Sequence, residues 1–259
     1  LAPVKPKPSL GISSLITDVD DFVEYLTWVI YGKNGTGKTT LLSTLENVLI
    51  LAVEDGTLSI RDKAKDAKKI KIDSWDKVEA VYWLLKNGEY KVEGIEIPVG
   101  KGKFLVKSIA IDTITRLSEV CMRSVVLGED SSSSEKDVIK RTLKDWGEMS
   151  EKIRFWLQKF EELPLHRVWL FQEQSNSEEV DADEFSIYPA VNKSLRTYVL
   201  SEADIIARTY IAKVENSMQY RLSAAASPKY VSKDRTNTIK KGAITNTDIT
   251  QIYNKIFRK

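Results

Sequence analysis

Gly32-Lys33-Asn34-Gly35-Thr36-Gly37-Lys38-Thr39-Thr40 matches the phosphate-binding pattern G-x-x-x-x-G-K-[ST] at every fixed position. Residues 25–31 before it form an apolar, β-rich run typical of a buried strand, and residues 41–49 after it have helical spacing. A strand, a glycine-rich loop and a helix in this order direct backbone N–H groups and the positive end of the helix at an anion. We therefore expect all nine residues of the loop to surround the phosphates of a nucleotide.

Within this loop, each residue type has its own expected role. Gly35 and Gly37 lack the Cβ atoms that would block close approach to the phosphates. The Lys38 ammonium is expected to reach the β- and γ-phosphates, and the Thr39 hydroxyl to coordinate Mg²⁺. The loop thus predicts a nucleotide and Mg²⁺ as ligands, with Lys38 also acting in catalysis.

A second acidic strand end is needed to hold Mg²⁺. Residues 104–112 form a mostly apolar run that ends in Asp112. Ligands of open α/β sheets bind at the carboxyl ends of the strands, where this carboxylate would lie. Asp112 is therefore predicted to be the Walker B acid and, with Thr39, a ligand of the metal.

Two further strand ends supply candidate catalytic groups. The run 49–53 is followed by Glu54-Asp55-Gly56, and a carboxylate at that position can orient the attacking water. We favour Glu54 as this catalytic residue, with Asp55 as the alternative, because spacing alone does not separate them. Gln172 follows the strand 167–171 and is predicted to contact the γ-phosphate.

Composition narrows the class of protein. The 259 residues are 42% hydrophobic and 29% charged, with a net charge of +2, as in a globular domain. No apolar run approaches the ~20 residues of a membrane span, and the Pro- and Lys-rich start has no export signal, so a cytoplasmic protein is expected. A single cysteine, Cys121, and a single histidine, His166, exclude an internal disulfide and a Cys/His zinc site. Both are expected to be structural.

Strand and helix patterns alternate along the chain, which predicts an α/β fold with a mainly parallel twisted sheet and helices on both faces. Helices are expected at 74–87, from 113 to 127, at 138–163 and at 248–257, and a hairpin at 89–103. Short β-like runs at 185–188, 205–214 and 218–223 predict a strand-rich C-terminal extension. We divide the chain into an N-terminal arm (1–24), an ATPase core (25–240) and a basic C-terminal helix (241–259).

The chain resembles the RecA-like P-loop core of recombinases and hexameric helicases, and more closely the small phage-encoded RecA-like ATPases of the single-strand annealing (Sak-type) group. The resemblance spans about residues 25–240. It is carried by the 32–40 loop, Ile111-Asp112-Thr113-Ile114-Thr115-Arg116-Leu117, Asp145-Trp146-Gly147, Leu163-Pro164, Tyr188-Pro189-Ala190, Arg221-Leu222-Ser223 and Ser232-Lys233-Asp234-Arg235.

This resemblance implies a Mg²⁺-dependent ATPase that assembles into a ring or filament and acts on single-stranded DNA, with phage recombination or replication proteins as partners, in the host cytoplasm. Related ring ATPases carry a Lys-x-Arg pair that reaches a neighbour's γ-phosphate. In this chain Lys233 and Arg235 would be that catalytic pair, with a solvated basic turn as the alternative. Head-to-tail contacts of this kind generate rings or filaments.

The expected DNA-binding side departs from the family pattern. The loops 128–136 and 174–184 are neutral or acidic, whereas phosphate contacts need Lys and Arg. Better candidates are 61–71, with six Lys or Arg and two Asp, and 229–259, with eight Lys or Arg and two Asp. A nucleotide-gated assembly or helicase-loading module with little DNA affinity is therefore the alternative function. A GTPase is disfavoured because no Asn-Lys-x-Asp motif is present, and a small-molecule kinase because no Arg-rich lid is evident.

Overall fold

The computed structural model describes residues 25–61, 63–64, 66–127, 141–176, 186–239, 243–245 and 247–257, without the side chains of 57 and 58. The N-terminal arm, the loop 128–136, most of the loop 174–184, and Lys240, Lys241, Arg258 and Lys259 lie outside these ranges. Within them, no helix is long and apolar enough to cross a membrane.

Ten of the described strands form one sheet, which runs β13-β11-β10-β1-β8-β7-β2-β3, with β9 paired to β8 and β12 to β10. Six strands are parallel: β1 (Thr27–Gly32), β2 (Val48–Ala52), β3 (Ala67–Lys71), β7 (Ser108–Asp112), β8 (His166–Ser175) and β10 (Ile205–Val214). The antiparallel additions are β9 (Ile187–Pro189), β11 (Ser217–Ser223), β12 (Lys233–Asp234) and β13 (Ala243–Thr245).

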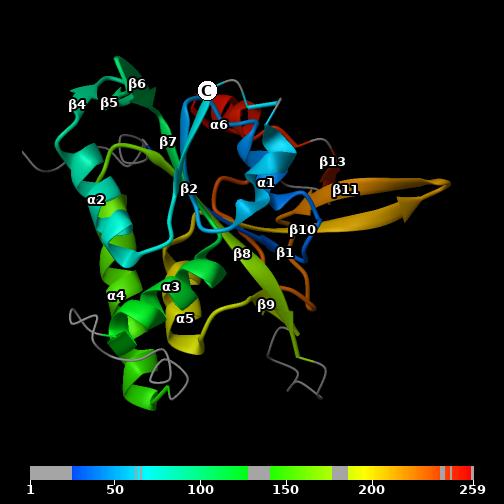
Figure 1. The fold of residues 1–259 in the computed structure, drawn as a ribbon. Helices are drawn as coiled ribbons and strands as arrows, with labels where there is room; N and C mark the ends of the chain where they lie inside the picture. Colours follow the sequence, from blue (N-terminus) through cyan, green and yellow to red (C-terminus); the bar gives the residue numbers. More distant parts are fainter. Residues whose placement is uncertain are drawn as a thin grey trace, which may run out of the picture.

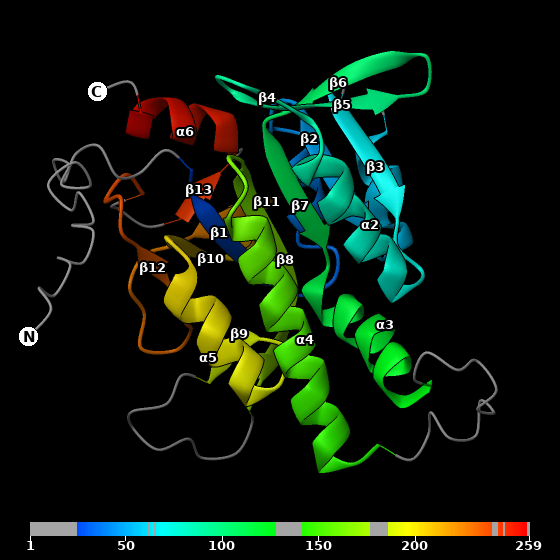
Figure 2. The same cartoon turned by 90° about the vertical axis from the view of Figure 1, so that its left-hand side faces the viewer.

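Helices cover both faces of the sheet (Figure 1). One face carries α2 (Trp75–Lys86), α3 (Ile114–Leu127), α4 (Leu143–Glu161) and α5 (Lys193–Glu202), which lie toward the viewer in Figure 2. The other carries α1 (Lys38–Leu42) and α6 (Ile249–Phe257). Alternate residues of β1 point to opposite faces of the sheet. Trp28 and Ile30 pack in the core beneath α1 and α6, whereas Val29 and Tyr31 pack in the core beneath α2–α5. The predicted RecA-like α/β fold class is confirmed.

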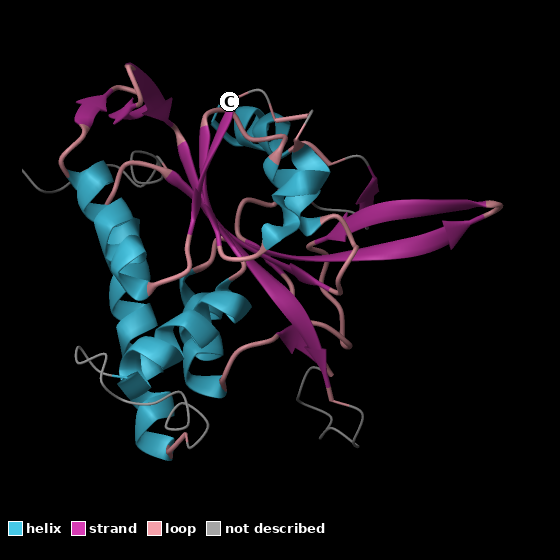
Figure 3. Ribbon diagram, viewed as in Figure 1, coloured by secondary structure: helices cyan, strands magenta, loops and turns pink. Residues whose placement is uncertain are grey.

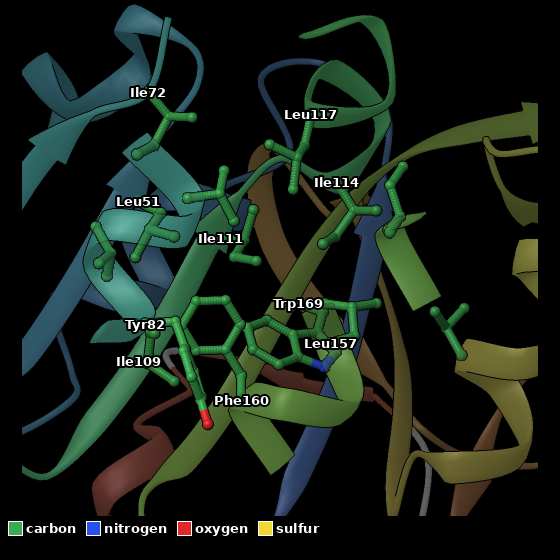
Figure 4. Packing of buried hydrophobic residues seen from close by; sticks show 14 of the residues in the cluster. Leu51, Ile72, Tyr82, Ile109, Ile111, Ile114, Leu117, Leu157, Phe160 and Trp169 are labelled. Carbon is green, nitrogen blue, oxygen red and sulfur yellow. The ribbon is translucent and has the colours of Figure 1, made fainter. Parts of the chain in front are cut away.

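The larger core lies between the sheet and α2–α4 (Figure 4). Tyr82 of α2, Phe160 of α4 and Trp169 of β8 meet edge to face there, with ring centroids 5.8 Å apart for the first pair and 6.4 Å for the second. Burying each large apolar side chain contributes about 1.5–3 kcal/mol. Cys121 is buried in the same cluster, and burial raises the pKa of its thiol to about 12, as expected for a structural cysteine.

The helix after the phosphate loop is shorter than its sequence pattern predicts. The helical spacing continues to residue 49, but α1 ends at Leu42 and β2 begins at Val48. The hydroxyls of Ser43 and Thr44 donate at 2.7 Å to the carbonyls of Thr40 and Leu41, which offers the backbone an alternative to further helix. Asn47 then takes a positive φ of 47°, which turns the chain into β2.

The expected strand 104–112 is two strands in two sheets. β6 (Gly102–Val106) joins β5 (Gly94–Val99) and β4 (Glu89–Lys91) in a small antiparallel sheet, which confirms and extends the predicted hairpin. β7 starts afresh at Ser108 in the main sheet. Both halves are apolar, so their composition does not reveal that the chain changes sheets at Lys107.

Other boundaries shift for local reasons. Of the expected helix 138–163, residues 141–142 precede α4, whose capping box between Thr142 and Asp145 fixes its start at Leu143. α5 was not predicted; its N-cap is Asn192, whose side chain accepts from Leu195 N at 3.0 Å. Part of the basic stretch 61–71 forms the edge strand β3.

The strand-rich extension was predicted, and its most prominent part is the β10–β11 hairpin, which projects beyond the helices (Figure 3). β13 joins the main sheet through β11, and α6 buries Ile249, Ile252 and Tyr253 against the core. The proposed boundary at residue 240 stays a prediction, although β13 and α6, which follow it, contact the core.

Candidate nucleotide-binding site

A cavity of about 740 Å³ lies at the carboxyl ends of β1, β7 and β8. This is the side on which parallel α/β sheets bind their ligands. It is lined by the phosphate loop and α1, by the segment after β2, by the ends of β7 and β8, and by parts of β10 and β11. In the strand order β8 lies between β1 and β7, and Lys38 and Asp112 both line this cavity.

The loop backbone has the shape that phosphate binding requires. Gly35 and Gly37 take φ of 77° and 90°, in the left-handed region that favours glycine. Gly32 is needed for a different reason, because a Cβ there would come within 2.2 Å of Thr209 Oγ1 on β10. Thr209 in turn lies 2.8 Å from Thr36 Oγ1, which fastens the loop to the sheet.

Lys38 is buried, with 6% of its surface exposed, and its Nζ donates to the carbonyls of Gly32 at 2.7 Å and Lys33 at 2.8 Å. Burial lowers the pKa of this ammonium, while the carboxylates of Asp112 and Glu54 oppose that shift. An ammonium held by two carbonyls has one proton left for a phosphate oxygen. The geometry therefore suits the predicted role of Lys38.

The two predicted metal ligands are brought together. Thr39 Oγ1 donates to Asp112 Oδ2 at 2.8 Å. Asp112 is 2% exposed, and burial raises its pKa, opposed first by this hydrogen bond. A hydroxyl and one carboxylate are hard oxygen donors that suit Mg²⁺, whose other ligands in such sites are phosphate oxygens and waters. No cluster of three or more His, Cys, Asp or Glu that could hold a metal ion occurs among the described residues.

Glu54 lies at the same end of the cavity and is held by three side chains. Thr113 Oγ1 donates to its carboxylate at 2.8 Å, Gln172 Nε2 at 3.2 Å, and Arg116 Nε lies 3.8 Å away. The exposed Asp55 begins a short 3₁₀ turn (Asp55–Ile60) and is not among the described residues that line the cavity. Of the two candidate carboxylates, Glu54 therefore lines the cavity and Asp55 does not.

Gln172 lines the cavity, and its side-chain amide donates to Glu54. Its backbone N–H donates to Thr115 Oγ1 at 3.0 Å, which links β8 to the start of α3. Sequence reasoning missed Thr113, Thr115 and Thr209. The first two closely follow Asp112 and could have been found from that position, but nothing local marks Thr209, which register alone places beside Gly32.

Lys233 and Arg235 do not join this group. β12 pairs with the start of β10, at Ile205 and Ile206, so both side chains lie at the amino ends of the strands. Lys233 Nζ donates to the carbonyls of Leu200 and Ser201, at 3.1 and 3.0 Å, and Arg235 bonds Ser201 O and Asp204 at 3.1 and 3.3 Å. Within one chain they cap the end of α5, so any catalytic role must be in a neighbour's site.

Comparison with protein families matches residues 24–236 to a family described as an AAA domain. No curated protein matches the sequence. Solved structures similar to the chain include the flagellar accessory protein FlaH from Methanocaldococcus jannaschii, at 13% identity and a TM-score of 0.40, and the KaiC-like protein PH0186 from Pyrococcus horikoshii, at 10% and 0.37. Each alignment covers 76% of both chains.

The fold assignment rests on the chain's own strand order and phosphate loop, because the TM-scores of those structures are low. The family match, in contrast, extends over most of the sequence and includes every residue of the cavity wall except Thr247. The chain therefore belongs to the AAA domain family and is a P-loop NTPase.

Proposed function

We propose that the protein is a Mg²⁺-dependent ATPase in which Glu54 orients the attacking water. The observation that carries this proposal is the position of Glu54, fixed by Thr113 and Gln172 beside the Thr39–Asp112 pair. A carboxylate so held can accept a proton from water near a γ-phosphate.

In this mechanism each residue either offsets the charge of the phosphates or positions a reacting group. The loop N–H groups and Lys38 bind the phosphates, and Thr39 and Asp112 hold Mg²⁺, which when bound offsets charge on the β- and γ-phosphates. Glu54 aligns water, and Gln172 keeps the Glu54 carboxylate in place and can contact the γ-phosphate itself. Positioning of this kind is the main source of catalysis in phosphoryl transfer.

We further propose that activity depends on self-association into a ring or filament, with Lys233 and Arg235 completing a neighbour's site. The support is their distance from their own chain's cavity: they lie at the opposite ends of the strands, where a head-to-tail partner's cavity would face them. Arg235→Ala protein should then bind ATP but hydrolyse it slowly. Mixing it with Glu54→Gln protein should restore activity at hybrid interfaces, and no recovery would count against the trans role.

We also propose that the protein acts on single-stranded DNA in phage recombination, annealing or replication. Its support is the exposed edge strand β3, where Lys68, Lys69 and Lys71 are all exposed. Lysines on an edge strand also prevent unwanted strand pairing, so the salt dependence of binding decides between the two explanations. Each phosphate contact to a single strand contributes about 0.7 to the slope of log K against log salt. Replacing the three lysines by glutamine should therefore lower that slope by about 2.

The first experiment is phosphate release from ATP, with Mg²⁺ or with EDTA, with and without single-stranded DNA, over a range of protein concentrations. Mg²⁺-dependent turnover that rises with DNA and steeply with protein concentration supports the full proposal. Turnover indifferent to DNA would indicate a nucleotide-gated assembly or helicase-loading module. Absence of any turnover would overturn the ATPase assignment.

A further inference from the structure

The cavity extends in two directions from Lys38. One end holds Glu54, Asp112, Thr113 and Gln172, the groups that handle water and metal. The other end runs along the exposed side of α1 to β11 and to Thr247, just before α6. A triphosphate whose terminal phosphate lies at the first end must place its nucleoside at the second. This second end has no role in the phosphate and metal chemistry of the first.

Tyr220 of β11 stands over this second end. Strand side chains alternate, so Tyr220 shares a face with Leu222, which is buried in the cluster beneath α1 and α6. A ring atom of Tyr220 lies 3.5 Å from where a Cβ of Gly37 would be, so the ring adjoins the phosphate loop. Tyr220 is nevertheless 59% exposed, so much of it remains accessible to a ligand.

Two hydrogen bonds hold α6 against the segment that follows α1 at this end of the cavity. Thr44, just after α1, accepts a hydrogen bond from Ile249 N of α6 at 3.0 Å, and Glu46 N donates to Thr250 at 3.2 Å. These bonds fix α6, and with it Thr247, against the end of α1. The lining along α1 and before α6 is rich in short hydroxyl side chains, with Leu41 as the apolar member: Thr40, Ser43, Thr44 and Thr247. The acidic residues that line the cavity in the described part of the chain, Glu54 and Asp112, belong to the first end.

We propose that Tyr220 is the stacking platform for the nucleobase of the bound nucleotide, and that the threonine-rich wall faces the edge of the base and the ribose. An aromatic ring can stack on any nucleobase, because every base has a π-face. A purine offers the larger face, so this end should favour ATP and GTP over CTP and UTP. The proposal deepens the ATPase assignment and rests on it.

Met218 provides a matched comparison. It occupies the same strand and the same face two residues earlier, is 69% exposed, and is not among the described residues that line the cavity. If exposure on the hairpin were all that mattered, Met218 and Tyr220 would respond alike to truncation. If Tyr220 stacks on a base, only Tyr220 will affect nucleotide affinity.

The test compares ATP with inorganic tripolyphosphate, both with Mg²⁺, by calorimetric titration of wild type, Tyr220→Ala, Tyr220→Trp and Met218→Ala. We expect Tyr220→Ala to weaken ATP binding about 10- to 100-fold, because alanine removes the base–aromatic contact. Tripolyphosphate, which has no base, should bind the variant as it binds wild type. Tyr220→Trp should keep ATP affinity, and Met218→Ala should change neither ligand.

Two results would overturn this site. Unchanged ATP affinity in Tyr220→Ala would show that the base lies elsewhere. Equal loss of ATP and tripolyphosphate would show that Tyr220 supports the phosphate loop instead. Failure of wild type to bind either ligand is a different outcome, because it overturns the ATPase assignment itself and the base site with it.

Discussion

The two ends of the same parallel strands carry buried polar groups of opposite character. At the carboxyl ends, Lys38, Glu54 and Asp112 line an open cavity. The ammonium donates to carbonyls of its own loop, and each carboxylate accepts from a threonine hydroxyl. At the amino ends, Arg167 is 7% exposed and donates to Thr27 Oγ1 and to the carbonyls of Tyr25, Glu161 and Leu163.

The difference separates function from structure. Buried polar groups cost free energy unless they are hydrogen-bonded, and Arg167 at the amino end meets that need within the chain. The carboxyl end holds charge where a ligand can enter. Changes at the carboxyl end should therefore reduce binding or turnover at constant stability, and changes at the amino end should reduce stability at constant affinity.

The largest effect is expected from Lys38→Ala. Loss of the ammonium removes the cation closest to the phosphates, so turnover should fall by at least about 10³-fold, the upper range for a single electrostatic contact, and ATP binding should weaken. Phosphate release, ATP titration and urea unfolding measure the three quantities. Lys144→Ala, on the exposed start of α4, is the control and should behave as wild type. Retained turnover in Lys38→Ala would contradict the assignment of residues 32–40 as the phosphate-binding loop.

Glu54→Gln should separate catalysis from binding. The amide keeps size and one hydrogen bond to Thr113 or Gln172 but cannot take a proton, so turnover should fall about 10²–10³-fold with ATP affinity unchanged. Asp55→Asn tests the alternative base. Should Asp55→Asn abolish turnover while Glu54→Gln spares it, Asp55 is the catalytic carboxylate and Glu54 is not.

The sequence predicted more of the carboxyl end than of the amino end. The loop, Asp112, Glu54 and Gln172 come from short local patterns at strand ends, and such patterns keep their meaning when the chain folds. Arg167 and Thr27 are joined across 140 residues by β1–β8 pairing, which no local signal encodes. The same holds for Thr209 and Tyr220, whose positions depend on strand register and alternation.

Element boundaries were missed where two physical influences compete. Residues 41–49 have helical spacing, yet the hydroxyls of Ser43 and Thr44 and the turn at Asn47 end the helix early. The apolar run 104–112 is shared between strands of two different sheets, and its pattern does not show where the chain passes from one sheet to the other. α5 was missed because its periodicity is weak and only two of its residues, Leu195 and Val199, are buried.

Arg167→Met should show the amino-end behaviour. Methionine retains much of the apolar stem but leaves Thr27 and three carbonyls without their donor, so the free energy of unfolding should fall by about 3 kcal/mol. The dissociation constant for ATP should stay within twofold of wild type, because the cavity is at the other end of the strands. Urea unfolding and ATP titration on the same preparation measure both. A large loss of affinity without loss of stability would contradict the division between the two ends.

The last effect, which develops only as pH falls, is the pH dependence of stability that His166 contributes at the amino end. Its Nδ1 accepts a hydrogen bond from Leu26 N at 3.1 Å, and its ring stacks on Tyr253 with centroids 4.0 Å apart. Burial, aided by the Arg167 charge, lowers the pKa of His166 from 6.5 to about 4. The neutral ring is therefore favoured by folding, and the unfolded chain binds the extra proton. The contribution is complete above pH 6.5 and is lost as pH falls toward 4, by up to about 3 kcal/mol.

Other groups titrate in this range with the opposite sign, since burial raises the pKa values of Glu161 and Asp112. The measurement is therefore a difference: urea unfolding of wild type and His166→Asn at several pH values between 7 and 4.5. Asparagine can still accept from Leu26 N but does not titrate, so the gap between the two proteins should narrow as pH falls. A gap that stays constant would mean that His166 protonates freely in the fold, and that the amino end is more open to water than its hydrogen bonds imply.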